Sequence, residues 1–230
     1  MVNSKNAFWQ ALLVSIFIFV AGLVLGFYVE VSNTNKSDFL IRNAEVDLLD
    51  QQMKIEFLSS NSNLNCEIAK DNLFEFADQL YADAVEFEQA DVQLTLKERE
   101  VLHKRYDLLR LSLWSESLSL RAKCGDNFHT LLYTFDYASE DIDVRAQQQV
   151  FSLILMDLKY KYPDQILLLP VASNLNIGSV DVVKENYNIT KSPSILVDEN
   201  IVLDELVSFD ELEFAVFGQK SDKKVIILKS

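Results

Sequence analysis

The chain has a long uncharged segment near its N-terminal end, and this segment limits the possible architectures more than any other feature. Residues Asn6–Val29 carry no charged side chain and are nearly all apolar. As a helix they would extend about 36 Å, enough to cross a hydrocarbon core of roughly 30 Å. We therefore expect a transmembrane helix over residues 7–29, after a short flank of residues 1–6, in a single-pass protein of the cell membrane.

A cleaved signal peptide is the alternative interpretation of this segment. Signal peptides have apolar cores of about 7–15 residues and end at small residues. Here the run is longer and ends in Phe27 and Tyr28 instead. These rings, with Phe8 and Trp9 at the other end, match the aromatic belts of membrane helices. Lys5 precedes the span, so the charge bias favours an N-terminus inside the cell and an extracytoplasmic body.

Gly22 and Gly26 form a GxxxG pattern within the span. Small residues at this spacing let two membrane helices approach closely, so one option is a homodimer formed through the span. The alternative is that these glycines reflect only the general frequency of glycine in membrane helices.

The composition excludes some partners and cofactors. The chain has 35 acidic against 21 basic residues, a net charge of −14, and an acidic surface repels phosphate backbones, so no nucleic-acid partner is expected. His103 and His129 have no nearby cysteines with which to form a zinc signature. The sequence has no phosphate-loop, dinucleotide-binding or hydrolase motif, so we expect no cofactor and no metal.

The first part of the body is expected to be helical. After a linker over residues 30–37, the helical region 38–125 contains neither proline nor glycine before Gly125, and glycine and proline are the usual breaks in helices. Apolar residues recur at helical spacing, predicting helices over about 38–58, from Cys66 onward, and from Thr95 to Gly125. Thr95 and Glu98 match a capping box, and Gly125 suits the left-handed position after a helix.

The cysteines fit this arrangement. A turn near residues 93–95 lies midway between Cys66 and Cys124, so an antiparallel pair of helices would place them side by side. A disulfide there would stabilise the protein by roughly 4 kcal/mol according to the chain-entropy account. Two free buried thiols are the alternative. Two sequons, at Asn35 and Asn188, would become glycosylation sites only in a host that glycosylates the exposed side.

The second part of the body, residues 126–219, alternates between strand-like and helix-like segments before a tail over residues 220–230. The expected order is βαβαββα, a mixed sheet with helices on its faces. The class is therefore α+β or α/β, preceded by a helical hairpin or small bundle. The expected segments are 129–135, 143–160, 165–171, 179–187, 194–197, 201–206 and 210–217.

Over about residues 127–218 the chain resembles the thioredoxin fold. The resemblance rests on this order and on the segment Ile189–Val197, which is similar to the loop that carries a cis-proline before the third core strand. It implies that Pro193 is cis and follows Ser192. It also implies a groove for an extended peptide beside the loop, formed by Ser192, Pro193, Ser194 and Tyr137.

The chain departs from thioredoxins where their redox cysteines stand, because the segment 136–145 contains no cysteine. Thiol–disulfide exchange at that position is therefore excluded. The acidic residues of the segment suit a helix N-terminus, with Asp141 or Asp143 in the cap or first turn. The alternative is a cation site, but the segment lacks the glycine and spacing of a calcium loop. That site would use Asp136, Glu140, Asp141 and Asp143.

These features predict a protein that binds or scaffolds another protein or an extended peptide at the membrane, and an enzyme is the less favoured interpretation. Binding by backbone pairing needs no cysteine. One alternative is a redox protein with a reversible Cys66–Cys124 disulfide. Another is a structural anchor or oligomerisation device that uses Gly22, Gly26 and the helices.

Overall fold

The chain forms an apolar N-terminal helix and a mixed α/β body, which belong to two separate compact units. The computed structural model describes residues 8–28 except 11, the isolated positions 46, 49, 50 and 53, and residues 65–89, 96–125 and 128–218. Several sequence predictions fall outside these residues or mostly so. They are the helix over 38–58, the Thr95 cap, the Asn35 sequon and the tail 220–230.

The apolar helix covers Phe8–Tyr28 and has a mean hydropathy of 2.5. Among the described residues it is the one helix long and apolar enough to cross a membrane, a test that a signal sequence also passes. Its large side chains are exposed. A Cβ added at Gly22 or Gly26 would meet no atom within 4 Å.

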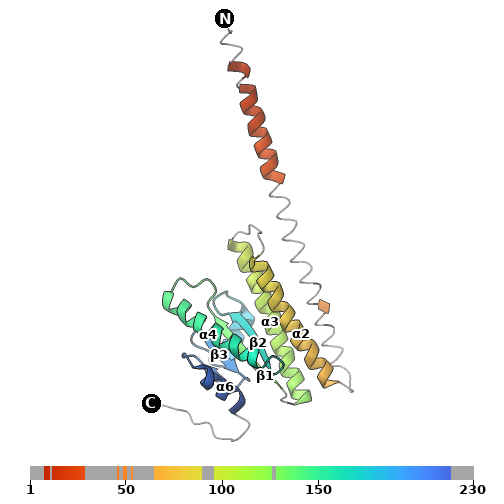
Figure 1. Ribbon diagram of the computed structural model, residues 1–230, viewed down its shortest axis with the longest axis vertical. Helices are drawn as coiled ribbons and strands as arrows, with labels where there is room; N and C mark the ends of the chain where they lie inside the picture. The colour runs from red at the N-terminus through yellow and green to blue at the C-terminus, as the bar shows by residue number, and fades with distance from the viewer. Residues whose placement is uncertain are drawn as a thin grey trace. The chain divides into compact units, whose positions relative to one another are not determined.

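The body begins with two long helices and continues with alternating strands and helices (Figure 1). From β1 onward, the order of elements is the one expected from the sequence, although β4 ends at Leu203 instead of Leu206. The elements are α2 (Cys66–Gln89), α3 (Leu96–Cys124), β1 (His129–Phe135), α4 (Ile142–Lys161), β2 (Ile166–Ala172), α5 (Gly178–Asn186), β3 (Ser194–Val197), β4 (Ile201–Leu203) and α6 (Phe209–Phe217).

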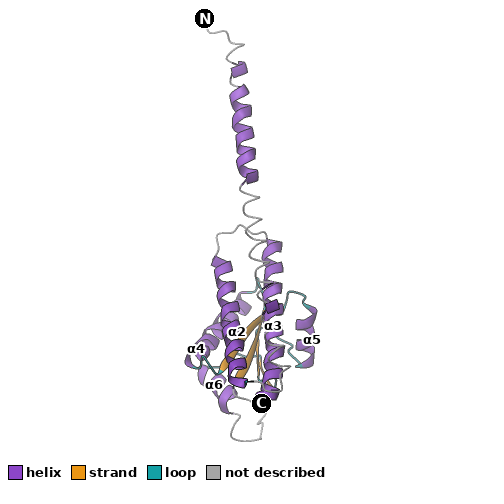
Figure 2. Cartoon of the chain, turned by 90° about the vertical axis from the view of Figure 1, so that its right-hand side faces the viewer, coloured by secondary structure: helices purple, strands orange, loops and turns teal. Residues whose placement is uncertain are grey.

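The four strands form one mixed sheet in the order β2-β1-β3-β4. Strands β1 and β2 are parallel, whereas β3 is antiparallel to both β1 and β4. Helices α2 and α3 lie on one side of the sheet, and α4 and α6 lie on the other (Figures 1 and 2). Helix α5 contacts α3. The sheet is therefore the middle of three layers, and the hairpin is one of the outer two.

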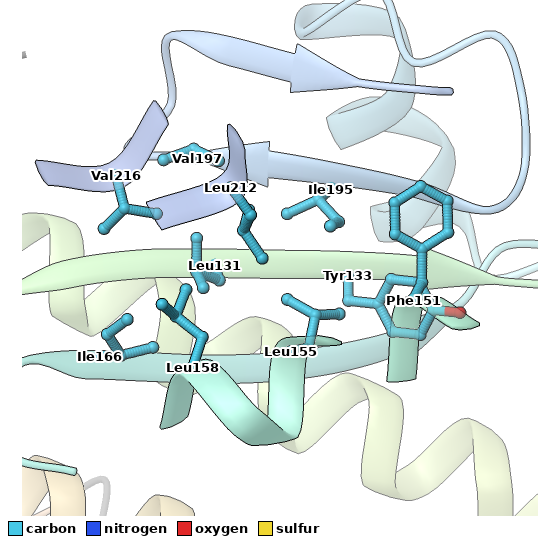
Figure 3. Packing of buried hydrophobic residues seen from close by; sticks show 10 residues of the cluster. All are labelled: Leu131, Tyr133, Phe151, Leu155, Leu158, Ile166, Ile195, Val197, Leu212 and Val216. Atoms are coloured by element: carbon cyan, nitrogen blue, oxygen red, sulfur yellow. The ribbon is translucent and has the colours of Figure 1, made fainter. Parts of the chain in front are cut away.

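The apolar core lies between the sheet and the α4–α6 layer (Figure 3). Side chains point to alternate faces of a strand, so Leu131 and Tyr133 of β1 both face this layer. They meet Leu155 and Leu158 from α4 and Leu212 from α6, and these leucines are at most 1% exposed. Each such side chain contributes about 1.5–3 kcal/mol of burial free energy, which fixes the helices on this face.

A disulfide between Cys66 and Cys124, whose Cα atoms are 5.7 Å apart, joins the two long helices at the ends away from the segment that connects them. Cys66 is the first residue of α2 and Cys124 the last of α3, as the hairpin geometry predicts. Gly125 follows with a φ of +85° and donates its backbone N–H to the Arg121 carbonyl. It is thus the left-handed residue that ends α3.

Strand β2 is an end strand of the sheet, and its outer backbone edge is occupied. Helices α2, α3 and α4 all contact β2, and side chains from α3 and α4 bond to its outer backbone groups. Lys159 donates to the Ile166 carbonyl at 3.2 Å, and Asp107 accepts the Ala172 N–H at 3.2 Å. Pro170 lies between them and has no N–H to offer, a residue that sheets tolerate only at an edge. These contacts leave little of the edge open to another strand.

Asp107 is fully buried on α3 beside Arg110, whose Nη1 donates to its Oδ1 at 3.3 Å. Burial raises the pKa of Asp107 to about 6, although the charge of Arg110 and the Ala172 N–H act in the opposite direction. The folded protein therefore binds a proton at Asp107 that the unfolded chain, with a pKa of 3.8, releases. Because of this linkage, the stabilisation from Asp107 is largest below about pH 4 and falls as the pH rises to about 6.

We expect Asp107→Asn to remove this dependence, because asparagine does not titrate. The wild type should lose about 3 kcal/mol of free energy of unfolding relative to the variant between pH 4 and 7. Urea unfolding of both proteins across this range measures the difference. Parallel profiles for the two proteins would contradict the assignment.

Candidate functional site

The loops that carry the predicted site meet where the strands end, and we call such a row of strand ends an edge, as distinct from the outer side of β2 or β4. Parallel strands β1 and β2 both end there, and antiparallel β3 begins there. Ligands of sheets of this kind bind outside the carboxyl ends of the parallel strands. The edge therefore brings together the loop after β1, the loop after β2 and the segment that precedes β3.

The loop after β1 is held to the loop after β2 by paired hydrogen bonds. Tyr137 donates its backbone N–H to Asn174 Oδ1 at 2.8 Å, and Asn174 Nδ2 donates to the Tyr137 carbonyl at 2.9 Å. The hydroxyl of Ser173 donates to Asp136 Oδ1 at 2.6 Å. Ala138 has a φ of +50°, a left-handed turn conformation. The loop is therefore fixed before any partner arrives.

The acidic residues of this loop act on the helix that follows. Asp141 is the N-cap of α4, and its Oδ1 accepts the backbone N–H groups of Asp143 and Val144 at 2.8 and 3.3 Å. Asp143 lies in the first turn, where a negative charge is favourable. Within the described residues, no group of acidic, histidine or cysteine side chains is arranged to hold a metal ion.

The segment before β3 contains a cis peptide bond between Ser192 and Pro193. Pro193 is buried, and Ser194 is fully buried with its hydroxyl donated to the Lys191 carbonyl at 2.6 Å. Ser194 therefore shapes the loop and has no surface to offer a partner. Ser192 is half-buried and lies beyond the last β1–β3 pair, Thr134 with Ser194.

Two buried polar atoms at this edge have no hydrogen-bond partner among the described residues: Ser192 Oγ and Gln148 Oε1. Gln148 lies on α4, and its Nε2 donates to the Asp136 carbonyl at 3.1 Å. Ser192 stands two residues before Ser194, and Asp136 two residues after Thr134, the partner of Ser194 in the last β1–β3 pair. Both unpaired atoms therefore belong to the segments that meet where β1 ends and β3 begins. We call Asp136, Tyr137, Gln148, Ser192 and Pro193 the Ser192 site.

The helical hairpin reaches the same edge through an aromatic contact. The His103 ring of α3 lies 4.0 Å from the Tyr137 ring, centroid to centroid. Behind this contact is a pocket of about 170 Å³ between the hairpin and the strand ends, which we call the hairpin pocket. It is lined by Ala84 of α2, by Leu102, His103, Tyr106 and Arg110 of α3, and by Phe135 and Pro170 of the sheet.

A buried polar cluster, absent from the sequence predictions, lies at the opposite edge of the sheet. Asp198, 6% exposed, accepts the Thr130 N–H at 2.9 Å, contacts His129 Nδ1, and pairs with Arg121 at 3.1 Å. Glu199 pairs with Arg121 at 2.8 Å and accepts the Thr130 hydroxyl. We call these five residues the polar cluster. It joins α3, β1 and the β3–β4 turn.

In the polar cluster, burial and the neighbouring positive charge shift the pKa of Glu199 in opposite directions. Burial raises the pKa of Glu199, whereas the Thr130 hydrogen bond and the charge of Arg121 lower it. Trp114 also donates its indole N–H to Glu199 at 3.2 Å. Every polar group named here has a partner within the protein, so the cluster has a structural role: it holds α3 to the sheet. The bonds to Asp198 and Glu199 join residues 68 to 78 positions apart, whereas Arg121 and Thr130, which are also bonded, are 9 apart.

The cysteines and Asn188, which belong to the same compact unit, lie away from the Ser192 site. Cys66 and Cys124 are at the edge where β1 begins, and a seven-residue strand of roughly 20 Å separates the two edges. Asn188 is exposed in the turn after α5, with a φ of +54°. The two histidines lie apart from each other along the fold: the His103 ring is tilted at 44° against Tyr137, and His129 contacts Asp198.

Comparisons with known proteins found no matching family model, no matching curated protein and no matching solved structure. The interpretation of the Ser192 site therefore depends on the residues and geometry of this chain.

Proposed function

We propose that this protein is a membrane-anchored, thioredoxin-like protein without redox cysteines that binds an extended segment of another protein. The apolar helix would hold it in the membrane, with the body on the extracytoplasmic side. The disulfide supports that side, because disulfides persist in oxidising compartments. The order of strands and helices and the cis bond before β3 support the thioredoxin-like class.

The observation that carries the binding proposal is the pair of unsatisfied buried atoms, Ser192 Oγ and Gln148 Oε1. A buried polar atom without a hydrogen bond costs about 1–3 kcal/mol. An extended chain placed across these strand ends would offer amide and carbonyl groups at regular intervals to the loops that meet there. Binding that turned either side chain toward the partner would recover a cost that the free protein carries at this site.

The same edge has no group suited to covalent chemistry. The segment 136–145 has no cysteine, and Asp141 is engaged as a helix cap. Of the two histidines, His129 contacts Asp198 at the other end of the strands, and the His103 ring lies against Tyr137. Noncovalent capture is therefore the function that this set of side chains supports best.

We expect the Ser192 site to select peptides from a library of random linear sequences. The probe is a displayed peptide library, selected on the full chain in lipid nanodiscs and counter-selected on empty nanodiscs. Selected peptides should bind Tyr137→Ala and Pro193→Ala at least tenfold more weakly than the wild type. The matched control is Val182→Ala, an exposed apolar position on α5 that should leave binding unchanged.

Stability of each variant is measured in parallel by thermal unfolding. The proposal requires that each variant loses more peptide binding than its smaller fraction of folded protein would account for. Failure to enrich any peptide, or equal binding by all variants, would refute it.

A further inference from the structure

The hairpin pocket lies next to the Ser192 site and shares a boundary with it. His103 lines the pocket, and its ring lies 4.0 Å, centroid to centroid, from the Tyr137 ring of the Ser192 site. Phe135 also lines the pocket and is followed directly in the chain by Asp136 and Tyr137. A segment that crosses the strand ends at Asp136 therefore passes the mouth of the pocket.

The size of the pocket matches one ring. Its volume is about 170 Å³, and an apolar cavity of roughly 150 Å³ is large enough to hold benzene. Ala84, Leu102, Phe135 and Pro170 supply apolar walls, of which Leu102 is 4% exposed. A long charged side chain would have to lose its hydration against these walls, at a large cost.

The other walls favour an aromatic group over an aliphatic one. Two aromatic residues of α3, Tyr106 and His103, line the space, and aromatic pairs prefer edge-to-face or offset contacts. Arg110 also lines the pocket, with its guanidinium carbon 5.9 Å from the Tyr106 ring centroid. Cations attract the face of a ring. A leucine of similar volume would gain none of these contacts.

We infer that the hairpin pocket binds one aromatic side chain of the captured segment, so that the hairpin adds sequence preference to backbone pairing. This inference rests on the proposed function for its biological partner. The pocket itself can be tested without a peptide. An aromatic residue should bind about two- to tenfold more tightly than an aliphatic one of similar size.

The test uses the full chain in nanodiscs and the probe N-acetyl-4-fluorophenylalanine amide, followed by fluorine NMR. We expect saturable binding that Ala84→Leu reduces at least tenfold by filling the pocket, and that Ala84→Val reduces less. The matched control is Ala82→Leu, an exposed position on the same helix that should leave binding unchanged. N-acetyl-leucinamide should compete at least twofold more weakly than N-acetyl-phenylalaninamide.

The outcomes separate the two proposals. Pro193→Ala should abolish capture of selected peptides and leave binding of the fluorinated probe unchanged. Probe binding without any peptide capture would retain the pocket and refute the proposed function. Three results would refute an aromatic site in the hairpin pocket: no saturable binding of the probe, competition by N-acetyl-leucinamide as strong as by N-acetyl-phenylalaninamide, or probe binding by Ala84→Leu as tight as by the wild type. Peptide capture that shows no aromatic preference would also overturn it, while leaving the Ser192 site intact.

Discussion

Replacing Asp198 with alanine is expected to lower the free energy of unfolding by about 3–5 kcal/mol, the usual result of breaking a buried charge pair from one side. The variant would leave the buried Thr130 N–H without its acceptor and His129 without its carboxylate. Arg121 would keep its ion pair with Glu199 but lose the one with Asp198. Urea unfolding, followed by the fluorescence of Trp114, measures the change.

Two controls separate the carboxylate from the backbone at this position. Asp198 has a φ of +45°, a conformation that alanine adopts poorly and glycine adopts freely. Asp198→Gly therefore removes the carboxylate without backbone strain and should retain most of the loss. Asp204→Ala breaks the exposed contact with Lys191, 3.0 Å long, and should change stability little. Similar midpoints for Asp198→Gly and the wild type would show that the polar cluster contributes nothing.

Loss of the disulfide is expected to have an effect of similar size. The double variant Cys66→Ser and Cys124→Ser should be less stable by about 4 kcal/mol, because the bridge connects residues 58 positions apart and restricts the unfolded chain. Wild-type protein treated with reductant should unfold at the same urea concentration as the double variant. The double variant should be insensitive to reductant, which provides the control.

The reduction potential of the same pair separates a structural bridge from a redox-active one. Thiol labelling over a range of redox buffers should give a potential below about −300 mV, typical of structural disulfides. A value near roughly −200 mV, within the range of redox-active proteins, would support the alternative of a reversible bridge. Full labelling without reductant would show that the bridge is absent.

The sequence predicted most of the body because its elements carry local signals. The apolar runs of β1 and β2 are bounded by polar residues, and Asp141 stands at the helix start that its side chain caps. The cysteine pairing followed from their equal distances to the hairpin turn. Ser208 and Glu211 form a capping box at the start of α6. That box was missed, although serine followed by glutamate three residues later is its usual signature.

The polar cluster and the hairpin pocket could not be predicted, because both depend on how elements far apart in sequence pack. Asp198 and Glu199 look like ordinary turn residues, and their role appears only when α3 brings Arg121 beside them. The apolar stripe of α3 predicts a buried face but does not identify the surface that buries it. The structure identifies that surface as β2 and β1.

The occupied outer edge of β2 also determines how copies of this protein could associate through their sheets. A sheet that offers two free edges can add strands at both and so polymerise without limit. Here Lys159, Pro170 and Asp107 block one end, which leaves strand addition to the β4 end. Two sheets joined through β4 would have no further edge to extend, so the association would stop at a closed pair. Growth of fibres through the sheet that the structure describes is thereby blocked.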